Sequence, residues 1–160
     1  MGFRSGNQYN DMINHLYEEY NNELFKNNAL DFDDLIVKTV HLFESRPDIL
    51  QGYQGRFRWI SVDEYQDLNF AQYRLLKLLK TSDVNLCVIG DPDQAIYGFR
   101  GSDVHFFNQF GHDYPGALRI RLKRNYRSTR TILKASYQVI RAGRARPEEA
   151  KAVGHAAVHV

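Results

Sequence analysis

The sequence WISVDEYQD occupies residues 59–67 and joins an apolar strand pattern directly to a group of carboxylates. Residues 57–62 are rich in aromatic and β-branched side chains, which predicts a β-strand. Asp63 and Glu64 follow that strand without an intervening turn. Because ligands bind at the carboxyl ends of strands in open parallel sheets, these two carboxylates lie where a ligand site is expected.

Strand and helix patterns alternate on the carboxyl side of this stretch. Apolar residues recur at helical spacing over residues 70–79, 102–110 and 128–140. Short apolar runs at 86–89 and 118–122 predict two further strands, the first of them buried on both faces. Ser128 is the expected cap of the last helix. This alternation favours an α/β fold in which parallel strands are joined by crossover helices.

The amino-terminal part of the chain predicts helices. Residues 9–26 place apolar side chains at helical spacing, and Asn27 and Asn28 end that pattern. Asp31 is the expected N-cap of a second helix. That helix should end before Pro47, because proline is tolerated only in the first turn of a helix.

Composition limits the class of protein. The chain has 160 residues, 43% of them hydrophobic and 25% charged, which is typical of a soluble globular domain. No apolar run approaches the roughly 20 residues that span a bilayer, so no membrane contact is expected. The first residues do not resemble a secretory signal, and a cytoplasmic location is expected. The single cysteine, Cys87, excludes an internal disulfide and a multi-cysteine zinc site, and its apolar surroundings predict a buried strand residue.

Charge is distributed unevenly along the chain, although the net charge is only +2. Residues 1–113 hold 10 basic and 17 acidic side chains, whereas residues 114–147 hold 10 basic side chains and no acidic one. A basic segment attached to an acidic body indicates a polyanionic partner, either nucleic acid or nucleotide phosphate. Alternatively, the basic segment is a solvated helix face.

Two further segments carry functional side chains. In GDPDQAIYGFRGS, residues 90–102, Gln94 can donate to a phosphate oxygen or position a water, and Tyr97 and Phe99 offer faces for stacked bases. In NYRST, residues 125–129, Arg127 can approach a phosphate as a charged donor and Tyr126 can stack on a purine.

Each of these segments also has a simpler interpretation. Asp63 and Glu64 could complement a helix dipole, the 90–102 segment could be a turn with buried aromatics, and Arg127 could lie at a solvated helix start. A third interpretation of the acidic side chains is a two-metal nuclease that uses Asp63, Glu64, Asp91 and Asp93.

Together with LDFDDLI, residues 30–36, these motifs resemble the UvrD/Rep/PcrA group of superfamily 1 DNA helicases in order and spacing. The resemblance covers about residues 30–140. It implies a partial RecA-like P-loop NTPase layer preceded by helices. The implied division is a helical segment of an inserted subdomain (1–30), part of the first motor domain (31–125), a helix that starts the second motor domain (126–142) and a poorly ordered tail (143–160).

The resemblance implies ATP and Mg²⁺ as ligands, with a role for each nucleotide-site residue. Asp63 would be the Mg²⁺-associated carboxylate and Glu64 the catalytic base. Gln94 would sense the γ-phosphate. Tyr126 would stack on adenine, and Arg127 would contact the γ-phosphate.

The resemblance also implies contact with single-stranded and duplex DNA. Tyr97 and Phe99 would stack on the bases of a single strand, although many relatives carry tryptophan at the second position. Arg100 would link the ATP and DNA sites. Helicases of this group move 3′ to 5′ along a single strand and unwind duplexes.

One departure from the helicase pattern is large. No Gly-x-x-x-x-Gly-Lys-Ser/Thr sequence occurs in the chain, and such a loop cradles the phosphates. The chain alone is therefore expected to hydrolyse little ATP and to need the remainder of a motor. The alternative is a non-catalytic module that binds single-stranded nucleic acid or another protein. A sheet with only part of the strands of a motor domain would also expose edge strands, through which copies of the chain could pair. His155 and His159 have metal-compatible helical spacing, which the alanine-rich tail disfavours.

Overall fold

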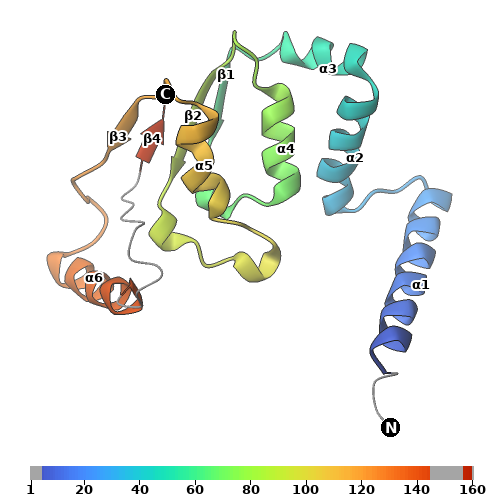
Figure 1. Ribbon diagram of the computed structural model, residues 1–160, viewed down its shortest axis with the longest axis horizontal. Coiled ribbons are helices and arrows are strands. Elements are labelled where there is room, and N and C mark those ends of the chain that lie inside the picture. The colour runs from blue at the N-terminus through green and yellow to red at the C-terminus, as the bar shows by residue number, and fades with distance from the viewer. Residues whose placement is uncertain (1–4, 145–156, 160) are drawn as a thin grey trace.

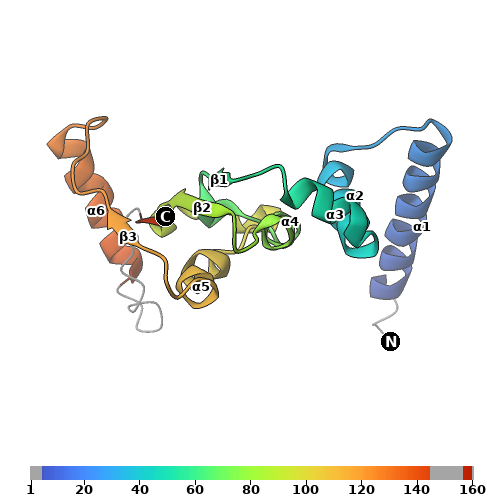
Figure 2. The same ribbon diagram turned by 90° about the horizontal axis from the view of Figure 1, so that it is seen from above.

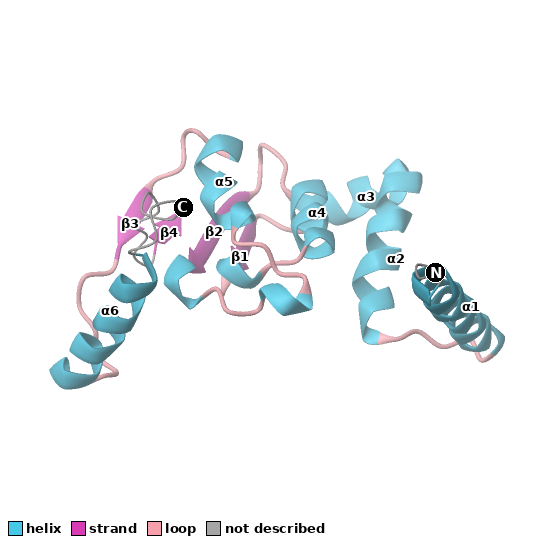
Figure 3. Ribbon diagram, turned by 60° about the horizontal axis from the view of Figure 1, so that its bottom comes forward, coloured by secondary structure: helices cyan, strands magenta, loops and turns pink. Residues whose placement is uncertain are grey.

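The sheet at the centre of the computed structural model, which describes residues 5–144 and 157–159, has four strands. They are β1 (Trp59–Val62), β2 (Asn85–Gly90), β3 (Arg119–Arg121) and β4 (Ala157–His159), in the order β1-β2-β4-β3. Strands β1 and β2 are parallel, with Ile60 opposite Leu86. Strand β4 is antiparallel to both β2 and β3, so it separates them (Figure 3). The mixed helices and strands with the parallel β1–β2 pair are compatible with the predicted α/β class, whereas the antiparallel β4 between β2 and β3 is not predicted.

Helices α4 (Phe70–Leu79) and α5 (His105–Asp113) follow β1 and β2, respectively. A capping box starts α4: the Asn69 side chain accepts from the Gln72 backbone N–H, and the Gln72 side chain accepts from the Asn69 N–H. Helix α4 then returns the chain to the parallel β2, as expected for a crossover connection.

The hydrophobic core lies between the sheet and these two helices. Its buried members are Tyr65, Leu76, Leu86, Val88 and Phe110. Because side chains alternate along a strand, Leu86 and Val88 face this core while Cys87 lies on the other face and is only half-buried. The prediction that residues 86–89 are buried on both faces is therefore wrong, since α4 and α5 both pack on the core side.

Helices α4 and α5 are held to each other by a partly polar cluster. The ring of Tyr73 stacks on Phe106 with 4.4 Å between centroids, and its hydroxyl donates to the Asp113 carboxylate. Lys77 Nζ lies 3.3 Å from Asp113 Oδ1 and 5.1 Å from the ring centroid of Tyr114. Burial raises the pKa of Tyr73, and the bond to Asp113 raises it further. These contacts join α5 to α4.

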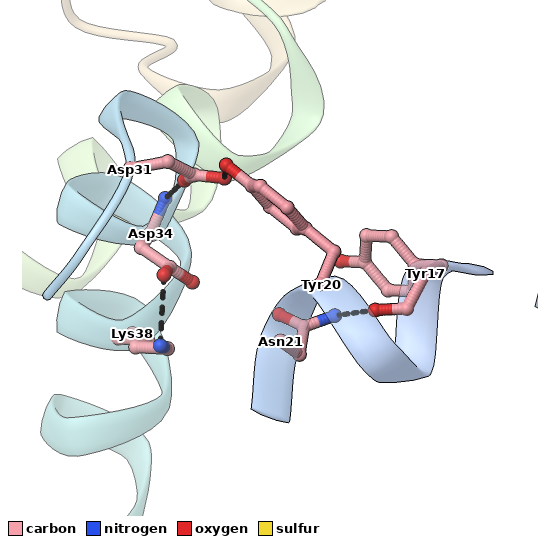
Figure 4. Close-up of polar contacts among 6 residues, drawn as sticks. All are labelled: Tyr17, Tyr20, Asn21, Asp31, Asp34 and Lys38. Carbon is pink, nitrogen blue, oxygen red and sulfur yellow. Dashed lines mark hydrogen bonds and ion pairs between the residues drawn. The ribbon is translucent and has the colours of Figure 1, made fainter. Parts of the chain in front are cut away.

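Helix α2 (Phe32–Ser45) begins where the sequence predicts a start, whereas helix α3 (Pro47–Gln54) is not predicted. Asp31 Oδ1 accepts from the Asp34 N–H at 2.8 Å, which confirms Asp31 as the N-cap, and the Asp34 carboxylate pairs with Lys38 (Figure 4). Helix α2 ends before Pro47, as expected, and Pro47 occupies the first turn of α3. Gln54 Nε2 donates to Leu78 O at 2.7 Å, which ties α3 to α4.

Helix α1 (Ser5–Lys26) lies at one end of the molecule and helix α6 (Arg130–Arg144) at the other (Figures 1 and 2). The Tyr20 hydroxyl of α1 donates to Asp31 Oδ2 at 3.1 Å, a contact that links α1 to the start of α2 (Figure 4). Many apolar side chains of α1 are exposed: Tyr9, Met12, Ile13, Leu16, Tyr17, Tyr20 and Phe25. Among residues 5–144, no helix combines the length and apolar character needed to cross a bilayer.

The carboxyl-terminal elements differ from the expected positions. Helix α6 begins at Arg130, so Ser128 is not its cap residue; the Thr129 hydroxyl accepts from the Ile132 N–H at 3.5 Å. Of the predicted tail at 143–160, the structure describes the end of α6 and strand β4. The remaining tail positions, including His155, lie outside the described residues.

Candidate functional site

The carboxyl end of β1 presents Asp63 and Glu64 to solvent. Glu64 has φ 49° and ψ 44°, a left-handed conformation that a residue with a side chain rarely adopts. Its backbone N–H donates to Asp63 Oδ1 at 2.9 Å. Both carboxylates remain exposed at this turn, while Tyr65 enters the core with 0% exposure.

A buried amide joins this turn to the end of β2. Gln66 is 1% exposed, and its Nε2 donates to Glu64 Oε2 at 2.7 Å. Its Oε1 accepts from the Asp91 backbone N–H at 3.0 Å. Sequence reasoning missed Gln66, because a glutamine among acidic residues has no local pattern that reveals its burial. The two strand ends are thus connected through one side chain.

The loop after β2 continues this hydrogen-bond path. Asp91 Oδ1 accepts from the Asp93 N–H, and Asp91 Oδ2 accepts from Gln94 Nε2, each at 3.0 Å. Gln94 is exposed. A continuous series of hydrogen bonds therefore runs from Glu64 through Gln66 and Asp91 to Gln94, so the structure connects two of the motifs that the sequence predicts to act together.

An open cleft of about 1020 Å³ lies beside Gln94. Its lining is Asp91, Gln94, Arg121, Leu122, Lys123, Arg124, Asn125, Tyr126 and Arg127. Four of these side chains are cationic, which makes the cleft attractive to phosphate groups. Gln94, Tyr126 and Arg127 line this cleft together. Asp63 and Glu64 do not line it, but Glu64 is connected to it through the hydrogen bonds of Gln66 and Asp91.

The segment that carries Tyr126 and Arg127 is shaped by Asn125. Asn125 Oδ1 accepts from the backbone N–H groups of Arg127 at 2.9 Å and Ser128 at 2.8 Å. The guanidinium of Arg124 lies 5.2 Å from the ring centroid of Tyr126. Tyr126 is 84% exposed, so one face of its ring remains available for a planar ligand.

A second exposed group lies on the loop between β2 and α5. The rings of Tyr97 and Phe99 are 6.1 Å apart, and the guanidinium of Arg100 lies 5.4 Å from each ring centroid. Tyr97 is 40% exposed and Phe99 is 79% exposed, so the alternative of a turn with buried aromatics is wrong. Exposed aromatic faces combined with a cation are typical of single-stranded nucleic-acid contacts.

The carboxylates suit magnesium in their chemistry. Mg²⁺ prefers oxygen ligands, commonly one or two carboxylates together with substrate phosphates and waters, and Asp63 is exposed and offers a carboxylate. Within residues 5–144 and 157–159, no group of three or more His, Cys, Asp or Glu side chains is arranged to hold a metal ion. Asp63, Glu64, Asp91 and Asp93 therefore do not form a two-metal cluster in the described part of the chain.

Comparison with known proteins gives consistent similarities. Residues 2–115 match the UvrD/REP helicase N-terminal domain family. Over 133 residues, 83% of this chain, the sequence is 52% identical to the ATP-dependent DNA helicase PcrA of Staphylococcus aureus (strain Mu50). It is 51% identical to PcrA of Staphylococcus epidermidis (strain ATCC 12228) over a segment of the same length. The matched segment spans 18% of the length of these relatives.

Proposed function

Since the chain belongs to the UvrD/REP helicase family, we propose that it is part of an ATP-dependent DNA helicase motor that acts in DNA repair or replication. In that motor it contributes the carboxylates that act on Mg²⁺-ATP and part of the track for single-stranded DNA. The observation that carries this proposal is the hydrogen-bond path from Glu64 to Gln94, which ends at a cationic cleft.

The proposed reaction is hydrolysis of ATP, in which water attacks the γ-phosphate. Mg²⁺ supplies charge neutralisation on the phosphate oxygens. Asp63 provides a carboxylate oxygen toward that ion, and Glu64 accepts the proton of the attacking water. Gln94 donates to the γ-phosphate, and Arg127 stabilises the charge that develops on it. Tyr126 stacks on the adenine, which its exposed ring permits.

The proposed architecture follows from the same assignment. Residues 31–125 form part of a RecA-like first motor domain, residues 1–30 belong to an inserted helical subdomain, and residues 126–142 start the second motor domain. The exposed apolar side chains of α1 support contact with the remainder of a motor. Strand β1 is an edge of the described sheet, so the isolated chain can also pair with a second copy there. The whole motor acts in the cytoplasm and moves 3′ to 5′.

A chimera tests this function directly. The matching 133-residue segment of S. aureus PcrA is replaced by the corresponding residues of this chain, so that the rest of PcrA completes the motor. We expect the chimera to unwind duplex DNA in an ATP-dependent manner, whereas the chain alone hydrolyses ATP slowly. A well-folded chimera that binds DNA without ATP-dependent unwinding would contradict the proposal.

A second candidate function is a non-catalytic module that binds single-stranded nucleic acid. The exposed group of Tyr97, Phe99 and Arg100 favours it, because this surface does not depend on a nucleotide. The module and the motor differ in one outcome: only the motor confers ATP-dependent unwinding on the chimera.

Removing the two rings is expected to weaken binding of a single-stranded oligonucleotide by the isolated chain. Base stacking contributes roughly 1–3 kcal/mol per base, so Phe99→Ala and Tyr97→Ala should each raise Kd by about 5- to 150-fold. Fluorescence anisotropy at low salt measures the change. Phe70→Ala is a suitable control, since Phe70 is 66% exposed but lies outside this loop. If the Kd values of Phe99→Ala and Tyr97→Ala equalled that of the control Phe70→Ala, the loop would be excluded from DNA binding.

A further inference from the structure

We propose that Gln66 is a positioning residue that holds the Glu64 carboxylate in place and links it to the loop after β2. The inference rests on the proposed function, in which Glu64 is the base for ATP hydrolysis. Gln66 itself does not touch the reacting atoms; it acts through Glu64 and Asp91.

The first argument is the use of both ends of one amide. Gln66 Nε2 donates to Glu64 Oε2 at 2.7 Å, and Gln66 Oε1 accepts from the Asp91 N–H at 3.0 Å. A glutamine amide donates at one atom and accepts at the other, whereas an ionised carboxylate only accepts. The position therefore matches an amide and not the acidic side chains that surround it.

The second argument is the space that the amide occupies. A Cβ at position 90 would lie 2.5 Å from Gln66 Oε1, 2.9 Å from Phe107 Cε2 and 3.2 Å from the Tyr65 backbone N. Only glycine leaves room at the end of β2 for the amide to reach the Asp91 N–H. With Gln66 1% exposed, its side chain has little freedom to adopt another rotamer.

The third argument is the exposure of Glu64. A solvent-exposed glutamate samples several rotamers, and a general base must lie within hydrogen-bond reach of its water. A bond to a buried, immobile amide restricts those rotamers. Because the same amide also binds Asp91, whose carboxylate binds Gln94, a displacement of the loop after β2 changes the position of the base.

Two substitutions separate the two bonds. Gln66→Glu keeps an acceptor for the Asp91 N–H but, when ionised, has no donor for Glu64. Gln66→Met has neither the acceptor for the Asp91 N–H nor the donor for Glu64. Gln54→Met is the matched control, since Gln54 also makes a side-chain bond, to Leu78 O, but lies away from the carboxylates.

The bridge is measured in the chain itself by hydrogen exchange of the Asp91 amide, followed by NMR. Gln66→Met should raise the Asp91 exchange rate by up to about tenfold, because one intramolecular hydrogen bond contributes about 1.4 kcal/mol or less, and Gln66→Glu should change the rate much less. Gln54→Met should leave it unchanged. An Asp91 rate that is the same in Gln66→Met as in the unsubstituted chain would overturn the bridge.

The effect on Glu64 is measured in the PcrA chimera as kcat and KM for ATP. Both Gln66 variants should lower kcat by about 10- to 100-fold, as expected for a misplaced catalytic group, with KM changed less. The kcat of Gln66→Glu should fall further as pH rises, since only its protonated carboxyl can donate to Glu64. A merely structural role would produce neither the pH dependence nor the separation of kcat from KM.

The two proposals fail in different ways. An unsubstituted chimera without ATP turnover overturns the proposed function, while the Asp91 exchange rates still decide whether Gln66 forms the bridge. An active chimera whose kcat is unaffected by both Gln66 substitutions overturns the positioning role and leaves the proposed function standing.

Discussion

Replacing Glu64 with glutamine is expected to lower ATP turnover of the chimera by roughly 10²- to 10⁴-fold, the range that a general base contributes. The substitution keeps the size of the side chain and an oxygen that accepts from Gln66 Nε2, so the turn after β1 should be preserved. What it removes is the capacity to take a proton from the attacking water. Steady-state turnover in the presence of single-stranded DNA measures the loss.

The matched control for this substitution is Glu44→Gln. Glu44 is an exposed partner of Arg74, away from the strand ends. Its substitution should leave turnover within about twofold, since exposed ion pairs contribute little. If Glu64→Gln retained the turnover of the control, Glu64 would not be the base, and the assignment of the β1 carboxylates would have to be revised.

Truncation of Phe110 is expected to have the largest effect on stability. Phe110 is 2% exposed, and its ring centroid lies 5.5 Å from that of Tyr65 and 4.8 Å from that of Tyr114. Phe110→Ala should lower the free energy of unfolding by about 3–5 kcal/mol, because it removes buried apolar surface and leaves a cavity. Urea denaturation of the chain, followed by circular dichroism, measures the change.

Phe99→Ala provides the comparison within the same chain. Phe99 is 79% exposed, so its truncation should change the free energy of unfolding by no more than about 0.5 kcal/mol. Comparing the two variants thus distinguishes a phenylalanine that stabilises the core from one that lies at the surface. Similar losses of stability in both variants would mean that α5 does not pack on the sheet as described.

Local features of the structure could be predicted from the sequence alone. Asp31 caps α2 and that helix ends before Pro47, because capping and the missing proline N–H act over a few residues. The two parallel strands lie within the predicted apolar runs or extend them by one residue at each end. The position of Asp63 and Glu64 at a strand end follows from their place in the chain, directly after β1.

The tertiary structure decided what depends on distant parts of the chain. The antiparallel β4 between β2 and β3 joins segments far apart in sequence, and no local propensity specifies such a pairing. The half-buried Cys87 reflects which face α4 and α5 cover. Gln66 illustrates the same limit at the site: its residue type permits two hydrogen bonds, but only the approach of β1 to β2 brings Glu64 and the Asp91 N–H within its reach.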